Sequence, residues 1–498
     1  MNLLSLLKAI GIQPHPAHEQ IEIKTLCTNS STACEDSLFV AITGYEKDGH
    51  EFIDDAVRLG ATAIIGEKEM VEERIPYYQV NNSRLALSAL ASEFYGNPTR
   101  GKIVIGVTGT NGKTTTSFMI RHILEQSGLK CALFGSVYTI VNGEITPAPA
   151  NTTPDALEFN KQMEHSQDDV VIMEVSSHGI AQHRIAGLEF DMCLFTNLDQ
   201  EHLDYHKTMD NYFNIKASLF NQLKEEGIAI ILSSDTWGEK LVEHVRSLGR
   251  KVVRVDGVNP DYYIGKYEIQ TASDSYLDLY RLKTGMFGRH NIENAGMAFA
   301  AVCELGISKE AAEEALSNFK NVPGRFELFD HPKQAVVVVD YAHTAGAFEH
   351  ILQTAREMGA KRIFHVFGFR GNRDPEKREY MVEVSVKYSD RSILTFDDLN
   401  KVSPEAMEKV LTELNKYEET LVIPDRTIAV QTAWEQLQEG DWLIITGKGH
   451  ELYKDRYVYA AESDIQLIQF LQNEENVSQR VSENNSYLSK NKLFLEKC

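Results

Sequence analysis

One short stretch, residues 103–116, constrains the fold of this chain more than any other. The β-branched run 103–105 predicts a strand, and the glycine-rich turn 106–112 leads from it into a segment typical of a helix. Glycines let the backbone approach phosphate groups, and a helix N-terminus presents N–H groups with a partial positive charge. The strict G-x-x-x-x-G-K-[ST] pattern fails at its first glycine, because Val107 stands there, but the rest is intact. The stretch therefore predicts a loop that binds the phosphates of ATP or GTP, a chance glycine-rich turn being the alternative.

Two residues of this loop have defined chemistry. Lys113 would reach the β- and γ-phosphates, and the hydroxyl of Thr114 would ligate Mg²⁺. Glu174 ends the apolar run 170–173, where a carboxylate can hold the same Mg²⁺, although taken alone it could equally cap a helix. The residues expected at the nucleotide are Gly109, Thr110, Asn111, Gly112, Lys113, Thr114 and Thr115.

Composition limits the partners of the chain. Lys+Arg 50 against Asp+Glu 72 gives a net charge of −22, which argues against nucleic-acid and anionic-membrane surfaces. The six cysteines are scattered without metal-ligand spacing, as in a reducing compartment. No apolar run approaches the roughly 18 residues of a membrane span, and the N-terminus lacks the basic region of a signal peptide. We expect a cytoplasmic, monomeric enzyme with no membrane insertion.

Strand and helix patterns divide the chain into three blocks and a tail. Short alternating strands and one helix fill residues 1–98, and the phosphate loop begins a central block over residues 99–326. Near-continuous apolar strands alternate with helical segments there and again over residues 327–472, before a polar tail over residues 473–498. This alternation predicts an α/β fold with mostly parallel sheets covered on both faces.

A second polar cluster follows the strand expected at residues 192–195. The run 196–206 is dense in histidine and carboxylate, which indicates a second metal or phosphate site, although a single histidine is more often structural. Further along, Lys216 lies on an expected helix, and by itself would be interpreted as a surface charge.

Together these motifs resemble the Mur ligase family, most closely its MurE type, the UDP-N-acetylmuramoyl-tripeptide synthetases. The resemblance covers about residues 20–470 and rests on the ordered motifs T-G-T-N-G-K-T-T, N-T-T-P, M-E-V-S-S-H-G, T-N-L-D-Q-E-H-L-D-Y-H, Y-F-N-I-K, G-R-H-N-I-E-N-A, V-P-G-R-F-E, V-D-Y-A-H-T and G-K-G-H-E. It implies a UDP-binding N-terminal domain, a central ATPase domain and a Rossmann-like C-terminal domain that brings an amino acid.

The resemblance also implies the reaction. ATP phosphorylates the terminal carboxylate of UDP-N-acetylmuramoyl-L-alanyl-D-glutamate, and an amino acid attacks the acyl phosphate to form an amide during peptidoglycan precursor synthesis. Catalysis then consists of positioning and charge neutralisation, without a protein nucleophile.

Site residues are implied in the same way. Lys113 is assigned to the phosphates, Thr114 and Glu174 to one Mg²⁺, and His202 and Lys216 to a second Mg²⁺. Lys216 is carbamylated in the family, which converts a cation into an oxygen ligand that suits Mg²⁺. Further nucleotide contacts are implied for Asn291, Arg325, Asp340 and His343, of which Asp340 alone could equally be a helix N-cap. Contacts to the UDP-muramoyl substrate are implied for Ser30, Asn151, Thr152, Thr153, Ser176, Gln182 and Arg184.

The sequence departs from the family where the amino acid is selected. MurE ligases carry a D-N-P-R motif whose arginine binds the distal carboxylate of meso-diaminopimelate, whereas residues 397–400 read Asp-Asp-Leu-Asn. Losing that pair forfeits about 1.5–3 kcal/mol, and Asp398 would add repulsion. We therefore expect meso-diaminopimelate to be disfavoured unless Lys401 substitutes, and lysine or ornithine to fit better, although lysine-adding relatives usually keep D-N-P. The implied amino-acid contacts are Arg373, Asp397, Asp398, Asn400, Gly447 and Glu451, with Arg373 at the carboxylate and Glu451 at the amine.

A second departure leaves an alternative open. The family's D-S-R near the uridine pocket is replaced by Asn-Ser-Ser at residues 29–31, which removes a charge pair. The alternative is a Mur-like amide ligase of specialised metabolism that joins a different carboxylate and amine. A nucleotide-binding regulator without turnover is weakened because Lys113, Glu174 and Lys216 are all present.

Overall fold

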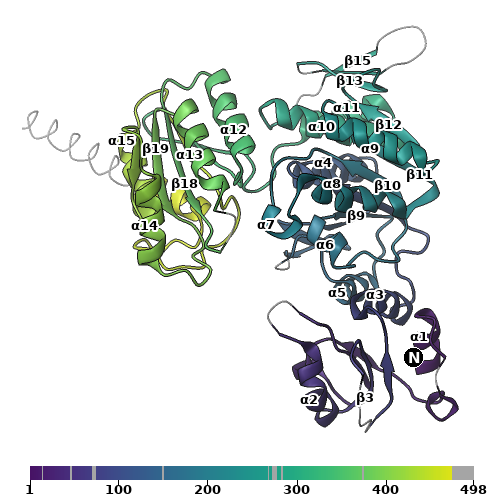
Figure 1. The fold of residues 1–498 in the computed structure, drawn as a ribbon. Coiled ribbons are helices and arrows are strands. Elements are labelled where there is room, and N and C mark those ends of the chain that lie inside the picture. Colours follow the sequence, from purple (N-terminus) through teal and green to yellow (C-terminus); the bar gives the residue numbers. More distant parts are fainter. Residues whose placement is uncertain are drawn as a thin grey trace, which may run out of the picture. The chain divides into compact units, whose positions relative to one another are not determined.

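The computed structural model of this chain describes residues 1–13, 15–44, 47–69, 75–148, 151–266, 268–271, 278–281, 284–372 and 375–473. Its strands form three sheets of four, eleven and six strands, most of them paired in parallel, as the α/β prediction requires (Figure 1).

The four-stranded parallel sheet belongs to the first block. Its order is β1-β2-β3-β4, and alternate residues of β2 face opposite sides. Leu38 and Val40 pack with helices α1 and α3, whereas Phe39 packs with α2, so both faces are covered. The elements are α1 (Leu3–Ala9), β1 (Thr25–Cys27), β2 (Ser37–Val40), α2 (Ile53–Arg58), β3 (Ala61–Gly66), β4 (Tyr77–Gln79) and α3 (Ser83–Phe94).

The eleven-stranded sheet holds the predicted phosphate loop. Its order is β15-β14-β13-β12-β11-β10-β5-β9-β6-β7-β8, with parallel pairing from β6 through β13 and antiparallel hairpins at both edges. The strands are β5 (Ile103–Thr108), β6 (Cys131–Phe134), β7 (Tyr138–Val141), β8 (Glu144–Pro147), β9 (Val170–Glu174), β10 (Phe190–Phe195), β11 (Leu223–Leu232), β12 (Lys251–Val255), β13 (Tyr262–Ile264), β14 (Glu268–Thr271) and β15 (Asp278–Arg281). The helices that follow them are α4 (Lys113–Gln126), α5 (Ala156–Met163), α6 (Ser177–Ala181), α7 (Leu203–His206), α8 (Met209–Ala217), α9 (Thr236–Ser247), α10 (Arg289–Glu304) and α11 (Lys309–Asn318).

The order of this sheet decides where the first site forms. Strand β5 lies between β10 and β9 and is parallel to both, so the carboxyl ends of all three strands meet at one edge. The loop after β5, Glu174 at the end of β9 and the residues after β10 are thereby brought together. Ligands of open parallel sheets bind at this edge.

The six-stranded sheet of the C-terminal block is the middle layer of a three-layer sandwich, with helices on both of its faces. Its order is β16-β17-β21-β18-β19-β20, with only β16 antiparallel to its neighbour within the described part of the chain. One face packs against α12, α13 and α14, and the other against α15 and the helical residues 464–473. The elements are β16 (Glu327–Asp330), β17 (Val336–Val339), α12 (Ala345–Glu357), β18 (Ile363–Phe369), α13 (Lys377–Tyr388), β19 (Arg391–Phe396), α14 (Pro404–Leu414), β20 (Thr420–Val422), α15 (Arg426–Gln436) and β21 (Trp442–Ile445).

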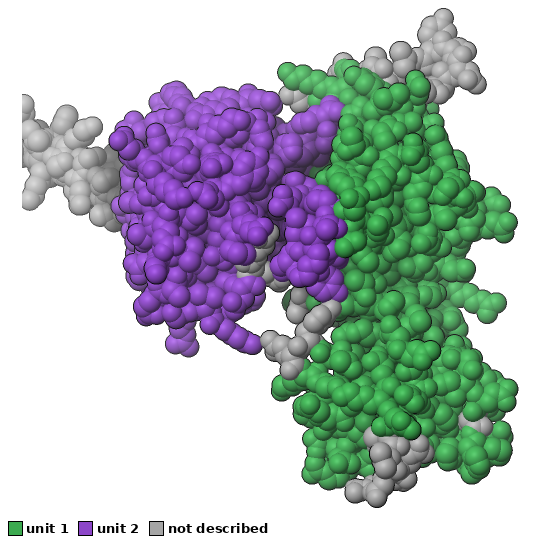
Figure 2. Space-filling view, in the orientation of Figure 1, with its two compact units in different colours: residues 1–198, 210–281, 294–316 green, residues 199–209, 282–293, 317–498 purple. Residues whose placement is uncertain are grey.

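The chain forms two compact units (Figure 2). Unit 1 comprises Met1–Leu198, Asp210–Arg281 and Asn294–Leu316, and unit 2 comprises Asp199–Met209, Leu282–Glu293 and Ser317–Cys498. Two segments of the central block, Asp199–Met209 and Leu282–Glu293, belong to unit 2; the first contains His202 and the second contains Asn291. The predicted domain boundaries near residues 98, 326 and 472 stay predictions. No helix in the described residues is both long and apolar enough to cross a membrane.

Candidate active site

The phosphate loop has a backbone that requires glycine at two positions. Gly109 has a φ of +145° and Gly112 a φ of +84°, both in the region that favours glycine. A Cβ on Gly109 would lie 1.9 Å from Oγ1 of Thr196, and one on Gly112 would lie 2.3 Å from Oδ1 of Asn294. Helix α4 begins directly after Gly112, so its first N–H groups lie at the loop as predicted.

Residues after β10 hold this loop in place. The N–H of Thr110 donates to the carbonyl of Asn197 at 2.9 Å, and the N–H of Asn111 donates to its side-chain Oδ1 at 2.9 Å. The hydroxyl of Thr196 donates to the carbonyl of Asn111 at 2.6 Å. Thr196 and Asn197 open the polar run 196–206, but neither was predicted from the sequence to support the loop, although a polar pair at the end of a neighbouring strand was the available signal.

Two lysines point at the loop backbone. Nζ of Lys113 donates to the carbonyls of Gly109 and Thr110, each at 2.8 Å, and Nζ of Lys216 donates to the carbonyl of Gly109 at 2.7 Å. Lys216 is 1% exposed and lies over the ring of Tyr212, so its interpretation as a surface charge is excluded. The fold thus places two ammonium groups at the phosphate loop from helices about a hundred residues apart in the chain.

Glu174 is the carboxylate at the centre of this site. It is fully buried, and Oε2 accepts hydrogen bonds from Thr114 at 2.9 Å and from the Ser136 hydroxyl at 3.1 Å. Oε1 accepts from the backbone N–H of Ser136 at 3.0 Å, and a Cβ on Gly135 would lie 2.1 Å from it. Glu174 therefore orients towards Thr114 instead of capping a helix. Ser136 is a supporting residue that no sequence motif indicated.

This donor set suits Mg²⁺. Carboxylate and hydroxyl oxygens are ligands of a hard cation, and Mg²⁺ in nucleotide sites takes only one or two carboxylates besides phosphate and water. Within the described ranges, no group of three or more His, Cys, Asp or Glu side chains is arranged to hold a metal ion by itself.

Most of the residues assigned to the UDP-muramoyl substrate form a connected group near Glu174. The hydroxyl of Thr153 lies 3.1 Å from that of Ser176 and donates to the carbonyl of Glu174 at 3.0 Å. Arg184 donates to the carbonyl of Thr153 at 2.9 Å and to the side chain of Gln182 at 2.7 Å. Oγ1 of Thr152 lies 3.2 Å from Oγ of Ser136. Asn151 is exposed, and Ser30 lies half-buried in the short helical turn after β1.

The histidine-rich segment belongs to unit 2. His202 has a left-handed φ of +56° and lies 3.6 Å from Glu201, whose other oxygen pairs with Nε2 of His343 at 2.6 Å. Burial would raise the pKa of Glu201, but His202 and His343 hold it well below its usual range. Lys216 lies in unit 1 and His202 in unit 2, and a shared Mg²⁺ stays a prediction.

The remaining residues predicted to contact the nucleotide also lie in unit 2. Asp340 follows β17 and accepts the N–H groups of Phe326 and Ala342, each at 2.6 Å, while Thr344 caps α12. Burial raises the pKa of Asp340, against the opposing charge of Arg325. Arg325 stacks over the ring of Tyr341, with 4.3 Å to its centroid, and Asn291 is buried and donates to the carbonyl of Phe287 at 2.7 Å.

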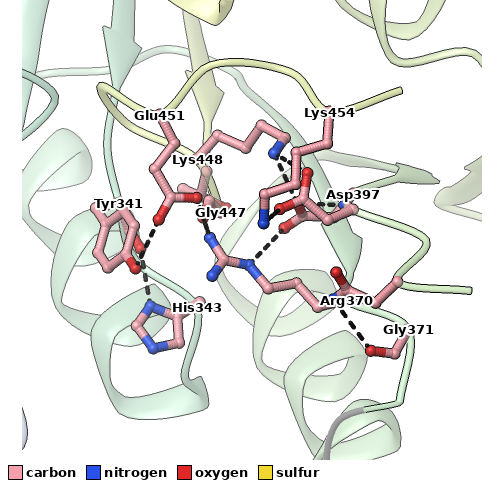
Figure 3. A network of polar contacts seen from close by, with 12 residues as sticks. Tyr341, His343, Arg370, Gly371, Asp397, Gly447, Lys448, Glu451 and Lys454 are labelled. Atoms are coloured by element: carbon pink, nitrogen blue, oxygen red, sulfur yellow. Dashed lines mark hydrogen bonds and ion pairs between the residues drawn. The ribbon is translucent and has the colours of Figure 1, made fainter. Parts of the chain in front are cut away.

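Loops after β21, β18 and β19 form a network of charged side chains (Figure 3). The guanidinium of Arg370 lies between Glu451, with which it pairs, and Asp397, at 3.7 Å. Glu451 also accepts from the hydroxyl of Tyr341 at 3.1 Å. Burial alone would raise the pKa of Asp397, but Lys448 and Arg370 lower it to about 2. Arg370 was not assigned a role from the sequence.

Asp398, the predicted selector of the amino acid, is paired within the chain. It is 1% exposed and contacts the ammonium groups of Lys448, itself fully buried, and Lys454, at 2.9 Å. Asn400 donates to the carbonyl of Gly371 at 3.2 Å, and a Cβ on Gly447, whose φ is +108°, would lie 3.1 Å from Asp397. Arg373, predicted at the carboxylate of the amino acid, lies outside the described residues.

The fold and the phosphate loop are typical of α/β proteins that bind nucleoside triphosphates. Comparisons with known proteins identify the family within this class. The chain matches the Mur ligase family catalytic domain over residues 22–95, the Mur ligase middle domain over residues 107–302, and the glutamate ligase domain of Mur ligases over residues 324–449. It belongs to the Mur ligase family.

Relatives and solved structures agree with this assignment. The UDP-N-acetylmuramoyl-L-alanyl-D-glutamate–2,6-diaminopimelate ligase of Syntrophomonas wolfei is 36% identical over 91% of this chain and 95% of its own. The enzyme of that name from Aquifex aeolicus is 36% identical over 90% of this chain and 93% of its own. A solved structure of such a ligase superposes with a TM-score of 0.66 at 24% identity, covering 96% of this chain and all of the other. The MurF ligase of Thermotoga maritima in complex with ADP has a TM-score of 0.61 at 22% identity, covering 86% and 94%, and shows a shared fold. The predicted resemblance to MurE-type ligases is confirmed.

Proposed function

We propose that this protein is an ATP-dependent ligase that adds a diamino acid to UDP-N-acetylmuramoyl-L-alanyl-D-glutamate, through an acyl phosphate, in peptidoglycan precursor synthesis. The observation that carries the proposal is the buried Glu174 held by Thr114 and Ser136 at a phosphate loop, in a chain of this family. Three of the diaminopimelate ligases that match the chain cover more than nine-tenths of it. They do not favour the alternative of a ligase for a different carboxylate and amine.

The residues of unit 1 supply the charge that this reaction needs. A triphosphate and a carboxylate repel each other, so cations must lie where they meet. Lys113 and the N-terminus of α4 would face the phosphates, while Thr114 and Glu174 would hold Mg²⁺, which when bound supplies further positive charge there. Thr153, Ser176, Gln182 and Arg184 would position the muramoyl substrate beside them.

A second Mg²⁺, held by His202 and a carbamylated Lys216, is part of the proposal. The support is the place of Lys216: its Nζ donates to the carbonyl of Gly109, so a carbamate there would carry its oxygens to the phosphate loop. Asn291, Arg325, Asp340 and His343 would contact the nucleotide from unit 2. We also propose that the enzyme acts as a monomer in the cytoplasm.

The experiment is phosphate release by the full chain with ATP, Mg²⁺ and UDP-N-acetylmuramoyl-L-alanyl-D-glutamate, across a panel of amino acids. Products are identified by mass. A product heavier than the dipeptide substrate by one amino-acid residue, formed only when ATP is present, is the expected result. Absence of any such product, from folded protein that binds ATP, would overturn the proposal.

A further inference from the structure

Asp398 cannot act as the selecting charge of the amino-acid site in the way its sequence position suggests. Its carboxylate is 1% exposed and is already neutralised by Lys448 and Lys454. A buried carboxylate with two ammonium partners neither repels a substrate carboxylate strongly nor attracts a substrate ammonium. Selection must therefore depend on other charges of the network.

The guanidinium of Arg370 has the position that selection requires. Arg370 lies in the loop after β18, and its side chain is 23% exposed. The guanidinium pairs with Glu451, whose side chain is 28% exposed. Asp397 lies on its far side at 3.7 Å and is 2% exposed, so the Arg370–Glu451 pair is the more accessible one (Figure 3). Tyr341 stands beside both: its hydroxyl donates to Glu451, and its ring lies 5.7 Å from the guanidinium carbon.

The charges of this network balance. Arg370, Lys448 and Lys454 are its cations, and Asp397, Asp398 and Glu451 are its carboxylates. A ligand whose distal carbon carries both an ammonium and a carboxylate can replace the Arg370–Glu451 pair by two pairs and keep the balance. A ligand whose distal end carries an ammonium alone, as lysine does, would occupy Glu451 and take from Arg370 its most accessible partner.

We propose that Arg370 is the residue that binds the distal carboxylate of the incoming amino acid, while Glu451 binds the ammonium on the same carbon. This inference rests on the proposed function and names its substrate class, a diamino dicarboxylic acid such as 2,6-diaminopimelate. The arginine missing from residues 397–400 is thereby replaced from a neighbouring strand of the same sheet, since β18 lies between β21 and β19. Without substrate, the guanidinium of Arg370 pairs with the carboxylate of Glu451, and it exchanges this partner for the distal carboxylate of the substrate when the substrate binds.

The test compares the full-length enzyme with Arg370→Gln, Arg370→Lys and the surface control Arg391→Gln. The KM and kcat are measured separately for meso-2,6-diaminopimelate and L-lysine at saturating ATP and UDP-muramoyl dipeptide. Wild type should prefer diaminopimelate. Arg370→Gln should lower the diaminopimelate-to-lysine ratio of kcat/KM by about 10- to 150-fold, mainly through the KM for diaminopimelate, because a charge-assisted bidentate pair is lost. Arg370→Lys should recover part of this ratio, and Arg391→Gln should retain all of it.

The outcomes separate the two proposals. A wild-type preference for lysine, or a ratio that Arg370→Gln changes by less than about threefold, would overturn the role of Arg370 while leaving the ligase activity intact. If wild type forms product with another amino acid of the panel but with neither of these two, this inference fails and the proposed function stands. If it forms product with no amino acid of the panel, the proposed function fails as well. The KM for ATP serves as the check that the variants are folded, and it should be the same in all four proteins.

Discussion

The phosphate loop of unit 1 and the charged network of unit 2 are built differently. At the loop, Lys113 and Lys216 donate to backbone carbonyl oxygens, and Glu174 accepts from hydroxyl and amide groups. In the network of unit 2, Arg370 and Lys448 are paired with carboxylates.

The two kinds of pairing set different conditions for binding a charged ligand. An anion arriving at the loop replaces hydrogen bonds to neutral dipoles, which cost little to exchange. A ligand arriving at the network must exchange full ion pairs, so its own charges have to match those it displaces. The first site is thus suited to any nucleoside triphosphate, whereas the second is suited to discrimination.

The largest effect is expected at the buried lysine of the network. Lys448→Ala should lower the free energy of unfolding of unit 2 by about 3–5 kcal/mol, because it leaves two buried carboxylates without their central cation. Lys454, which is 67% exposed, is the matched control, and Lys454→Ala should cost less than about 1 kcal/mol. Urea unfolding followed by tryptophan fluorescence measures both, since Trp434 and Trp442 lie in unit 2. Equal losses for the two variants would contradict the distinction between buried and exposed pairs.

At the loop the effect should appear in catalysis. Lys113→Ala should lower kcat for ATP-dependent product formation by about 10²- to 10³-fold, the usual result of removing one group that stabilises developing charge. The free energy of unfolding should change little, because the hydrogen bonds lost end on neutral carbonyls. Lys240→Ala, which removes a surface lysine of the same unit, should retain full activity. A Lys113→Ala enzyme with wild-type kcat would show that the loop does not bind the reacting phosphates.

Acid should destabilise unit 2 through a buried histidine. Burial, with a further contribution from Arg426, lowers the pKa of His365 to about 3, and its ring nitrogens lie 2.8 Å from Ser385 and 2.9 Å from Thr446. The unfolded chain binds this proton near pH 6.5, so stability falls as the pH drops below that value. His365 should account for a loss of about 2 kcal/mol between pH 7 and pH 5.

The measurement is the urea unfolding of wild type and His365→Gln at both pH values. Glutamine can keep a hydrogen bond but does not titrate, so the variant should show a smaller fall in stability between pH 7 and pH 5. The comparison uses this difference and is independent of any overall loss of stability in the variant. An identical fall in the two proteins would exclude His365 as the source.

The smallest expected effect is that of Ser136, which donates hydrogen bonds to the carboxylate of Glu174 at the loop site. Ser136→Ala removes the hydroxyl that donates to Oε2 at 3.1 Å but keeps the backbone N–H bond to Oε1. The Mg²⁺ concentration for half-maximal activity should rise by about tenfold, at the low end for groups that orient metal ligands. Ser127→Ala, whose hydroxyl donates only within its own helix end, is the control. An unchanged Mg²⁺ requirement would remove Ser136 from the site.

The elements whose geometry depends on adjacent residues of the chain could be predicted from the sequence. The phosphate loop follows from the succession of strand, glycines and helix, and Glu174 follows from a carboxylate ending an apolar strand. These local patterns specify backbone geometry directly, and the family resemblance that they carried is confirmed. Ser136 was missed because a single hydroxyl has no pattern of its own.

The pairing of charges in the network of unit 2 could not be predicted from the sequence. Strand β21, the last in the sequence of its sheet, inserts between β17 and β18, which brings Lys448 to Asp398, fifty residues earlier in the chain. The same insertion brings Glu451 to Arg370, 81 residues earlier. A motif shows which charges a loop carries, but only the strand order shows which of them pair with each other and which remain accessible to a substrate.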